Sequence, residues 1–398
     1  MLDKLQAAVS FGEKLGADFV EVRYDDLTLR TLRKINSTWK DVILKSRTGI
    51  GVTCYFDGTT GYSYTASLEC KDIEETINRA YRMAKAASTV ATLKLAFDEQ
   101  PAVKSKPSDT LPVKIHPKTK TQHFKMNLIN RMIEAAQEAG KEIQTVSGAY
   151  GELYGQKLFT NSEGSEINWQ FLIIDMPCRV TSKTSSGGMV FGTHKKAGTY
   201  GIEIFEQKGS TPEEIGKAAG EIAAEQIKAK PCPAGTFSTL LDNKLTGVLA
   251  HESFGHLSEA DYVVMGVSPL TDKIGTKLGA KHTTIIDGGV PDIMKYGGVW
   301  LPYDDQGTRG NQTMVLDKGV LKHYLQSRGT AQKLEQEPTG NCRAVHFGFM
   351  PIPRMTNTYF SPGDLTEEEA LEQLGKGIYA IQTTGGEVKG DGSFLFKA

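Results

Sequence analysis

The chain has 398 residues, of which 39% are hydrophobic and 23% charged, and its formal net charge is −1 at pH 7. This length exceeds one ordinary domain, and the composition is that of a globular protein with large cores, which excludes a disordered chain. A net charge near zero argues against direct binding of nucleic acid or of a membrane surface.

The N-terminal sequence, the lack of long apolar runs and the pattern of cysteines together indicate the cellular compartment. The N-terminal residues lack the charged-then-apolar layout of a signal peptide, and no apolar run approaches the ~18 residues that span a bilayer. The five cysteines form no CxxC pair, and an odd, scattered set is typical of reduced thiols. We therefore expect a cytoplasmic protein.

Residues 1–100 predict a small α+β domain. Apolar residues recur with helical spacing over 1–16, and strand-like segments follow from about residue 18. These strands mostly alternate apolar and polar residues, which indicates a mainly antiparallel sheet with one covered face. Residues 70–88 predict a second helix. The proline- and lysine-rich residues 101–125 predict an extended linker.

Residues 126–398 predict a larger, β-rich C-terminal domain, so the expected fold class is α+β. A helix is expected over 126–141, followed by strands and a glycine-rich turn. Thr211 predicts the N-cap of the next helix, with Pro212 at its first position. Thr366 and Glu369 predict a capping box further on. Between these elements, a short strand leads into a helix near Asn243.

The helix near Asn243 continues into the sequence LAHESFGHLSE, residues 249–259. It brings two imidazoles, His251 and His256, together with the carboxylate of Glu252. These are the groups that a catalytic zinc site needs as ligands and as a base. The zinc-protease motif HExxH, however, places its histidines four residues apart, and here they are five apart.

This spacing makes a structural demand. Positions i and i+5 of an α-helix point about 140° apart, so two imidazoles could not hold one ion. A π-type bulge would return them to one face, and Gly255 makes that distortion easier because it has no Cβ. The alternative is an amphipathic helix in which the histidines are ordinary polar residues.

The context of the motif resembles a known family. LTGVLAHESFGHLSEAD (245–261) and RMTNTYF (354–360) are similar to the TldD/PmbA family, formerly called modulators of DNA gyrase. The resemblance is to the TldD type, which carries HExxxH, whereas the PmbA (TldE) type lacks it. It extends over nearly the whole chain, through residues 301–332, the segment PTGNCRA (338–344) and the N-terminal segments FVEVRYDD and GIGVTCYFDGTTGYSYT.

The resemblance implies a zinc-dependent peptidase of the cytoplasm that hydrolyses unfolded or unstructured peptides. It implies that His251 and His256 are zinc ligands and that Glu252 is the catalytic acid/base. Relatives commonly work as a TldD–TldE heterodimer, so the expected partner is a second copy or a TldE/PmbA-like chain. They are thought to hold the peptide as an added strand. The alternative function is a non-catalytic regulatory subunit of such a complex.

A third zinc ligand is the missing part of the predicted site. In the TldD pattern it is a cysteine in a glycine-rich segment that follows GDGSFLF, so it is expected beyond Ala398. Cys342 and His282 are weaker substitutes. Glu259 and Asp261 match an acidic pair of the family, as a ligand or, more favoured, as groups that orient a histidine.

Two further polar clusters have alternative interpretations. Arg354, Thr356 and Asn357 either line the substrate groove or form a short polar strand that fixes neighbouring loops. The segment YDDQGTRG (303–310) either supplies a carboxylate–guanidinium pair near the site or is a solvated turn.

Overall fold

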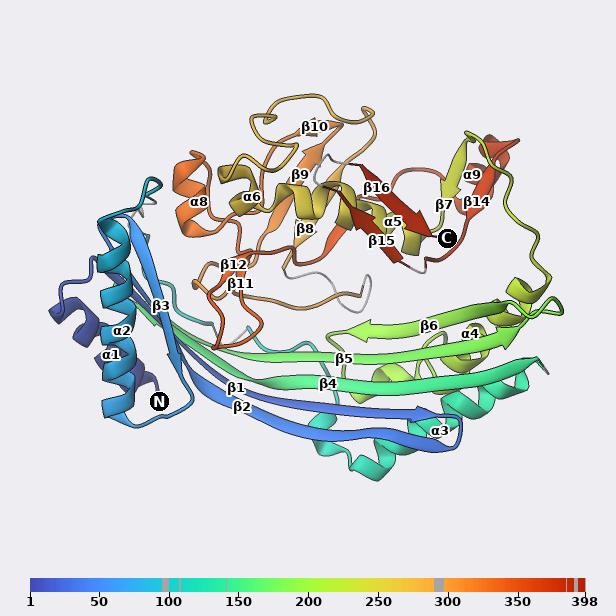
Figure 1. Ribbon diagram of the computed structural model, residues 1–398, viewed down its shortest axis with the longest axis horizontal. Helices are drawn as coiled ribbons and strands as arrows, with labels where there is room; N and C mark the ends of the chain where they lie inside the picture. The colour runs from blue at the N-terminus through green and yellow to red at the C-terminus, as the bar shows by residue number, and fades with distance from the viewer. Residues whose placement is uncertain are drawn as a thin grey trace.

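A long, curved antiparallel sheet spans the molecule and cradles its C-terminal part (Figure 1). The computed structural model describes residues 1–94, 100–106, 109–140, 142–289, 297–383, 385–389 and 393–397. Six strands pair in the order β3-β2-β1-β4-β5-β6. They are β1 (Phe19–Ile35), β2 (Thr38–Phe56), β3 (Thr59–Thr65), β4 (Ile143–Asn161), β5 (Glu166–Lys183) and β6 (Met189–Gly198).

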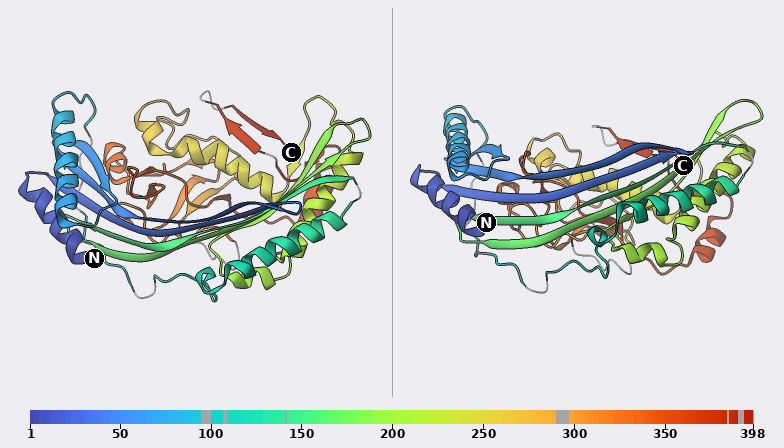
Figure 2. Two further views of the ribbon diagram at one scale, coloured as in Figure 1. Left: turned by 60° about the horizontal axis from the view of Figure 1, so that its bottom comes forward. Right: turned by 90° about the horizontal axis from the view of Figure 1, so that it is seen from below.

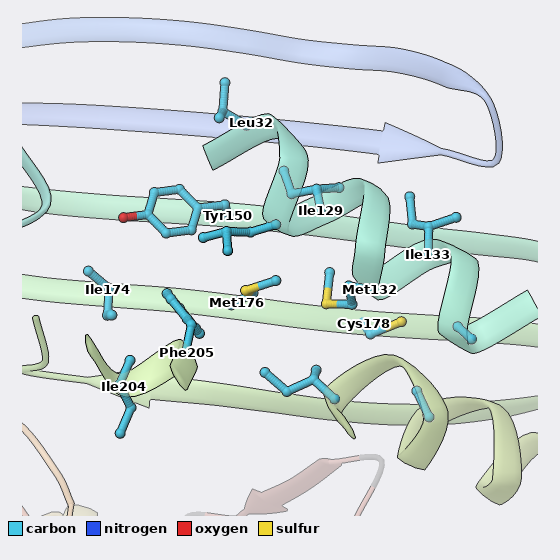
Figure 3. Packing of buried hydrophobic residues seen from close by; sticks show 14 of the residues in the cluster. Leu32, Ile129, Met132, Ile133, Tyr150, Ile174, Met176, Cys178, Ile204 and Phe205 are labelled. Atoms are coloured by element: carbon cyan, nitrogen blue, oxygen red, sulfur yellow. The ribbon is translucent and has the colours of Figure 1, made fainter. Parts of the chain in front are cut away.

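Two pairs of helices pack against the sheet, one pair toward each end (Figure 2). They are α1 (Leu2–Lys14), α2 (Cys70–Ser88), α3 (Gln122–Glu138) and α4 (Pro212–Lys228). Figure 3 shows Ile129, Met132 and Ile133 of α3 above Met176 and Cys178 of β5, all buried in one hydrophobic cluster. Burial of such side chains stabilises the fold by about 1.5–3 kcal/mol each.

Most helix predictions are confirmed. Helices α1, α2 and α4 match the expected segments, and Thr211 caps α4 in a full capping box with Glu214. Helix α3 begins four residues before the expected start, because the side chain of Thr121 accepts a hydrogen bond from the Phe124 amide and caps it there. Residue 141, the expected end of this helix, lies outside the described residues.

The expectation that only one face of the sheet is covered is wrong for the first half of β1. Val20 and Val22 face the helices, as the alternation predicts. The intervening Glu21, Arg23 and Asp25 are also buried, being only 1–3% exposed. Alternate residues of a strand point to opposite faces, and the C-terminal part covers the second face. Ionic partners there replace water around these charges.

The C-terminal part contains a four-stranded sheet, several strand pairs and short helices. The sheet order is β10-β9-β8-β13. The strands are β7 (Thr239–Leu241), β8 (Ile285–Gly288), β9 (Gln312–Asp317), β10 (Val320–Leu321), β11 (Cys342–Arg343), β12 (Ile352–Pro353), β13 (Thr358–Phe360), β14 (Ile378–Ala380), β15 (Gly385–Val388) and β16 (Phe394–Lys397). The helices are α5 (Asn243–Ala250), α6 (Ala260–Val264), α8 (Arg328–Lys333) and α9 (Glu367–Leu374). Thr366 and Glu369 form the expected capping box of α9.

The α+β class with mainly antiparallel sheet is confirmed. Strands β1 and β4 lie side by side from Glu21 to Ile35, so segments on both sides of residues 101–125 share one sheet. The division of the chain into domains at 101–125 stays a prediction. Among the described residues, no helix is long and apolar enough to cross a membrane.

Candidate functional site

The histidine motif lies at a change of helix type. The Asp242 side chain accepts a hydrogen bond from the Leu245 amide, at 2.7 Å, and caps the start of α5. At Ala250 the helix passes into one π-helical turn, His251–Gly255, and then a 3-10 turn, His256–Ser258. The His256 amide donates to the His251 carbonyl, five residues earlier. The bulged turn predicted from the spacing is therefore confirmed.

Gly255 packs against Met355, which lies between strands β12 and β13. A Cβ on Gly255 would lie 1.9 Å from the Met355 sulfur, far inside van der Waals contact. Met355 is itself buried, with 6% of its surface exposed. The glycine thus serves close packing as well as the bulge, which the sequence alone did not reveal.

The π turn places the two imidazoles side by side. The ring centroids of His251 and His256 are 4.6 Å apart, with ring planes at 79° to each other. Desolvation by the surrounding protein and the neighbouring His256 lower the pKa of His251, so its neutral, ligand-competent form is favoured. Glu252 lies between the two histidines in the sequence, and its charge acts to raise the pKa of both rings.

Glu259 orients the second histidine. Its Oε2 lies 3.4 Å from His256 Nδ1 and accepts a 2.6 Å hydrogen bond from Arg354 Nη1. The contact between Glu259 and His256 raises the pKa of His256, and the charge of Arg354 acts against this rise. The Glu259 side chain is fully buried, and its other oxygen, Oε1, has no hydrogen-bond partner within the described part of the chain. Such a contact fixes which imidazole nitrogen carries the proton.

The other candidate ligands lie in different surroundings. The carboxylate of Asp261 accepts from the Tyr262 amide, and burial raises its pKa. Cys342 is buried with a thiol pKa well above its usual value, and the nearby charges are Asp304, Glu21, Asp305 and Arg23. His282 is exposed in a turn. Within the described ranges, no three His, Cys, Asp or Glu side chains gather as a metal site.

Thr356 and Asn357 hold strand β13 in place. The hydroxyl of Thr356 donates to Asp287, which also accepts its amide at 2.9 Å. The Asn357 side chain donates to the carbonyls of Gly288, at 2.6 Å, and Val299, at 2.8 Å. These bonds match the interpretation as a polar strand that fixes neighbouring loops. Arg354 differs, because it faces Glu259. The groove role of all three residues stays a prediction.

The two aspartates of the segment YDDQGTRG are buried and do not lie in a solvated turn, whereas its place near the histidine site stays a prediction. Asp304 and Asp305 are 2% exposed. Asp305 accepts from Lys157 on β4 at 2.6 Å and lies 3.5 Å from Arg23 on β1. Arg309 instead pairs with Asp109, at 3.1 Å. The partners come from strands more than a hundred residues away, so local sequence gave no signal of the burial.

Arg343 is a functional candidate that the sequence did not single out. It lies on β11, lines a cavity together with Arg354, and donates a hydrogen bond to the carbonyl of Met355. Its only sequence signal is its place in PTGNCRA, one of the segments that resemble the TldD pattern.

A metallopeptidase class fits this arrangement, and comparisons with known proteins support it. Models of the PmbA/TldA metallopeptidase match along the chain: domain 1 at residues 20–84, the central domain at 115–227 and the C-terminal domain at 234–398. The chain therefore belongs to the PmbA/TldD metallopeptidase family.

Individual relatives agree over most of their length. A metalloprotease of Methanocaldococcus jannaschii is 30% identical over 398 residues, covering 100% of this chain and 84% of the relative. A zinc metalloprotease TldD homolog of Saccharolobus solfataricus is 25% identical over 401 residues, covering 96% and 82%. The structure of TldE from Thermococcus kodakarensis superposes with a TM-score of 0.73 at 16% identity, covering 99% and 86%, so it shares the fold.

Proposed function

We propose that this protein is a zinc-dependent peptidase of the HExxxH type that hydrolyses unfolded or unstructured peptides. The observation that carries the proposal is the π turn, which sets the His251 and His256 rings 4.6 Å apart with Glu252 between them in sequence. Two imidazoles and a carboxylate are the donor and base set of such a site, so these residues fit a zinc ion. The zinc metalloprotease name of one relative supports the choice of metal.

Each residue has a defined task in this proposal. A zinc ion held by His251 and His256 would supply Lewis-acid polarisation of the scissile carbonyl and lower the pKa of a water molecule. Glu252 takes the proton from the attacking water and returns it to the leaving amine. Glu259 holds His256 through Nδ1, which leaves the Nε2 of that ring for the metal. The third ligand stays a prediction.

The proposed function includes a binding partner and a cellular location for the protein. We propose that the protein works as a dimer, with a second copy or with a TldE-like chain. The likeness to TldE supports a shared assembly type. We also propose a location in the cytoplasm, which the free cysteines support.

Cleavage by an acid/base variant tests the function. The protein, with stoichiometric zinc, is incubated with an unstructured fluorogenic peptide, beside Glu252→Ala and the control Glu225→Ala, an exposed residue of α4. Loss of the acid/base lowers kcat/KM by about 10²–10⁴-fold, whereas the control keeps the wild-type rate. Zinc content, measured on each sample, should not change.

One result of this experiment would contradict the proposed peptidase function. If the wild type and Glu252→Ala cleave equally, the peptidase assignment fails. The function that then remains is a non-catalytic regulatory subunit of a TldD–TldE-like complex.

A further inference from the structure

A cavity of about 360 Å³ lies between the sheet and the C-terminal part. The sheet contributes Leu27 of β1, Lys157 of β4, and Trp169 and Phe171 of β5 to its wall. The opposite wall comes from residues 301–305 and from the segment 343–354. This volume is in the range of ligand pockets, which are mostly apolar with a few placed polar groups.

The charged groups of the cavity wall are mainly cationic. Three cations, Lys157, Arg343 and Arg354, stand against one anion, Asp305. Lys157 is paired with Asp305, at 2.6 Å, and Arg354 with Glu259, at 2.6 Å. Two of the three cations therefore already have an ionic partner.

Arg343 differs from the other two cations. No carboxylate of the described residues lies within salt-bridge distance of it, and its Nε is buried without a hydrogen-bond partner. One Nη donates to the Met355 carbonyl. A guanidinium has five donors in a planar fork that matches a carboxylate. Four buried carboxylates act on this guanidinium from beyond salt-bridge distance, those of Asp287, Asp304, Asp305 and Glu259. They leave the Nε without a partner, and an unused buried donor is costly, so a carboxylate bound directly at the fork would stabilise it.

The cavity is connected to the histidine turn through one carboxylate. Arg354 lines the cavity, and its Nη1 contacts the same Glu259 oxygen that lies 3.4 Å from His256 Nδ1. Apolar side chains, among them Trp169, Phe171 and Ile352, line the rest of the wall. The wall therefore offers guanidinium donors beside apolar surface.

We propose that this cavity is a substrate subsite that binds a peptide carboxylate next to an apolar side chain, with Arg343 as the principal contact and Arg354 beside it. The identity of the ligand as a peptide rests on the proposed peptidase function. The carboxylate has two sources in a peptide, the C-terminus and an internal acidic side chain.

Binding of short peptides to the metal-free, full chain distinguishes these sources. Isothermal titration compares three N-acetylated, alanine-rich peptides: one ending in leucine with a free carboxylate, its C-terminal amide, and the amide with an internal glutamate beside the leucine. A charge-assisted contact with a guanidinium favours the matching acid over the neutral amide by about 10- to 100-fold. The tighter of the two acidic peptides identifies the source.

Val345 offers a matched set of variants that spare the fold. It lines the cavity and is 69% exposed. Val345→Asp should weaken binding of the acidic peptide by about 3- to 10-fold, and Val345→Lys should strengthen it. Val345→Asn, nearly isosteric with the aspartate variant and neutral, should bind as the wild type does. Arg343→Gln, checked for native thermal unfolding, should lose the preference for acid over amide.

Two results would overturn the inference: neither acidic peptide binds better than the amide, or the aspartate and lysine variants at Val345 bind the acid equally. Because binding is measured without zinc, it is independent of cleavage. If cleavage depends on Glu252 but no acid preference exists, the subsite fails and the peptidase function stands.

Discussion

Glu259 is the residue on which the arrangement around His256 depends. One oxygen of its buried carboxylate meets both an imidazole, at 3.4 Å, and a guanidinium, at 2.6 Å. Arg354 neutralises the carboxylate, which makes its burial possible. The carboxylate in turn fixes the ring of His256. Asp261, two residues on, contacts the backbone of Tyr262 instead.

This difference predicts unequal effects on zinc binding. Glu259→Gln should weaken zinc affinity by about 10- to 100-fold, because the orienting contact is lost. Asp261→Asn is the matched control and should leave the affinity close to that of the wild type. Competition with a chromogenic chelator measures both values. The NMR titration of the metal-free protein should also show a lower pKa for His256 in the glutamine variant, since the Glu259 hydrogen bond raises it.

Equal losses in the two variants would contradict a specific role for Glu259. A variant that no longer folds natively would show a lower unfolding temperature. Arg354→Gln removes the ionic partner of Glu259 but keeps the carboxylate, so it distinguishes loss of the orienting contact from loss of the fold.

Gly255 predicts a stability effect that helix propensity alone would not. In Gly255→Ala the new Cβ would meet the Met355 sulfur at 1.9 Å, so we expect a loss of about 1–3 kcal/mol in the free energy of unfolding. Gly247→Ala, in the preceding helix, meets nothing within 4 Å and should gain about 0.5–1 kcal/mol. Urea unfolding measures both. A neutral or stabilising Gly255→Ala would show that Met355 yields easily.

Among the structural elements, the π turn at His251–Gly255 could be predicted from the sequence, but its tertiary contacts could not. The five-residue spacing and the glycine together predicted the π bulge, because both act within one helix. The partners of the turn could not be predicted this way. Met355 and Arg354 come from about a hundred residues further along the chain, and only the tertiary fold brings them to Gly255 and Glu259. The same holds for the cavity around Arg343.

Strand β1 carries a pH-sensitive contact to the C-terminal part. Burial raises the pKa of Glu21 to about 7, while Arg328 and hydrogen bonds from Tyr55 and Gln306 act against the shift. The folded state holds this proton more tightly than the unfolded state does. The stabilisation that protonated Glu21 gives to the folded state is therefore present below the ordinary pKa of 4.5 and is lost as the pH rises through 7.

Glu21→Gln should remove this dependence. We expect nearly equal free energies of unfolding for variant and wild type at about pH 5, and a variant more stable by on the order of 1–3 kcal/mol at about pH 8. Urea unfolding at both pH values measures the difference. Glu74→Gln, an exposed glutamate of α2, is the control and should follow the wild type. A parallel pH dependence of Glu21→Gln and wild type would contradict the assignment.

At the scale of the whole molecule, a buried ionic joint connects the sheet to the part that carries the histidines. Oδ1 of Asp305 meets Lys157 of β4, whereas Oδ2 lies near Arg23 of β1 and accepts a hydrogen bond from the Ala344 amide at 2.8 Å. Burial by itself would raise the pKa of Asp305, but the charges of Lys157 and Arg23 hold it below its usual value. Stability from this group is therefore lost only as pH falls through that lowered pKa.

The joint predicts that Asp305→Asn destabilises the protein strongly. The variant keeps the size of the side chain but leaves two buried cations without their common carboxylate, which costs about 3–5 kcal/mol. Urea unfolding at neutral pH measures the loss. Asp109→Asn removes the partner of the half-exposed Arg309 and should cost about 1 kcal/mol or less. Because Asp305 also borders the Arg343 cavity, weakening this joint should loosen the cavity together with the packing of the two parts. Equal, small effects of the two variants would show that the C-terminal part is held on the sheet by apolar packing alone.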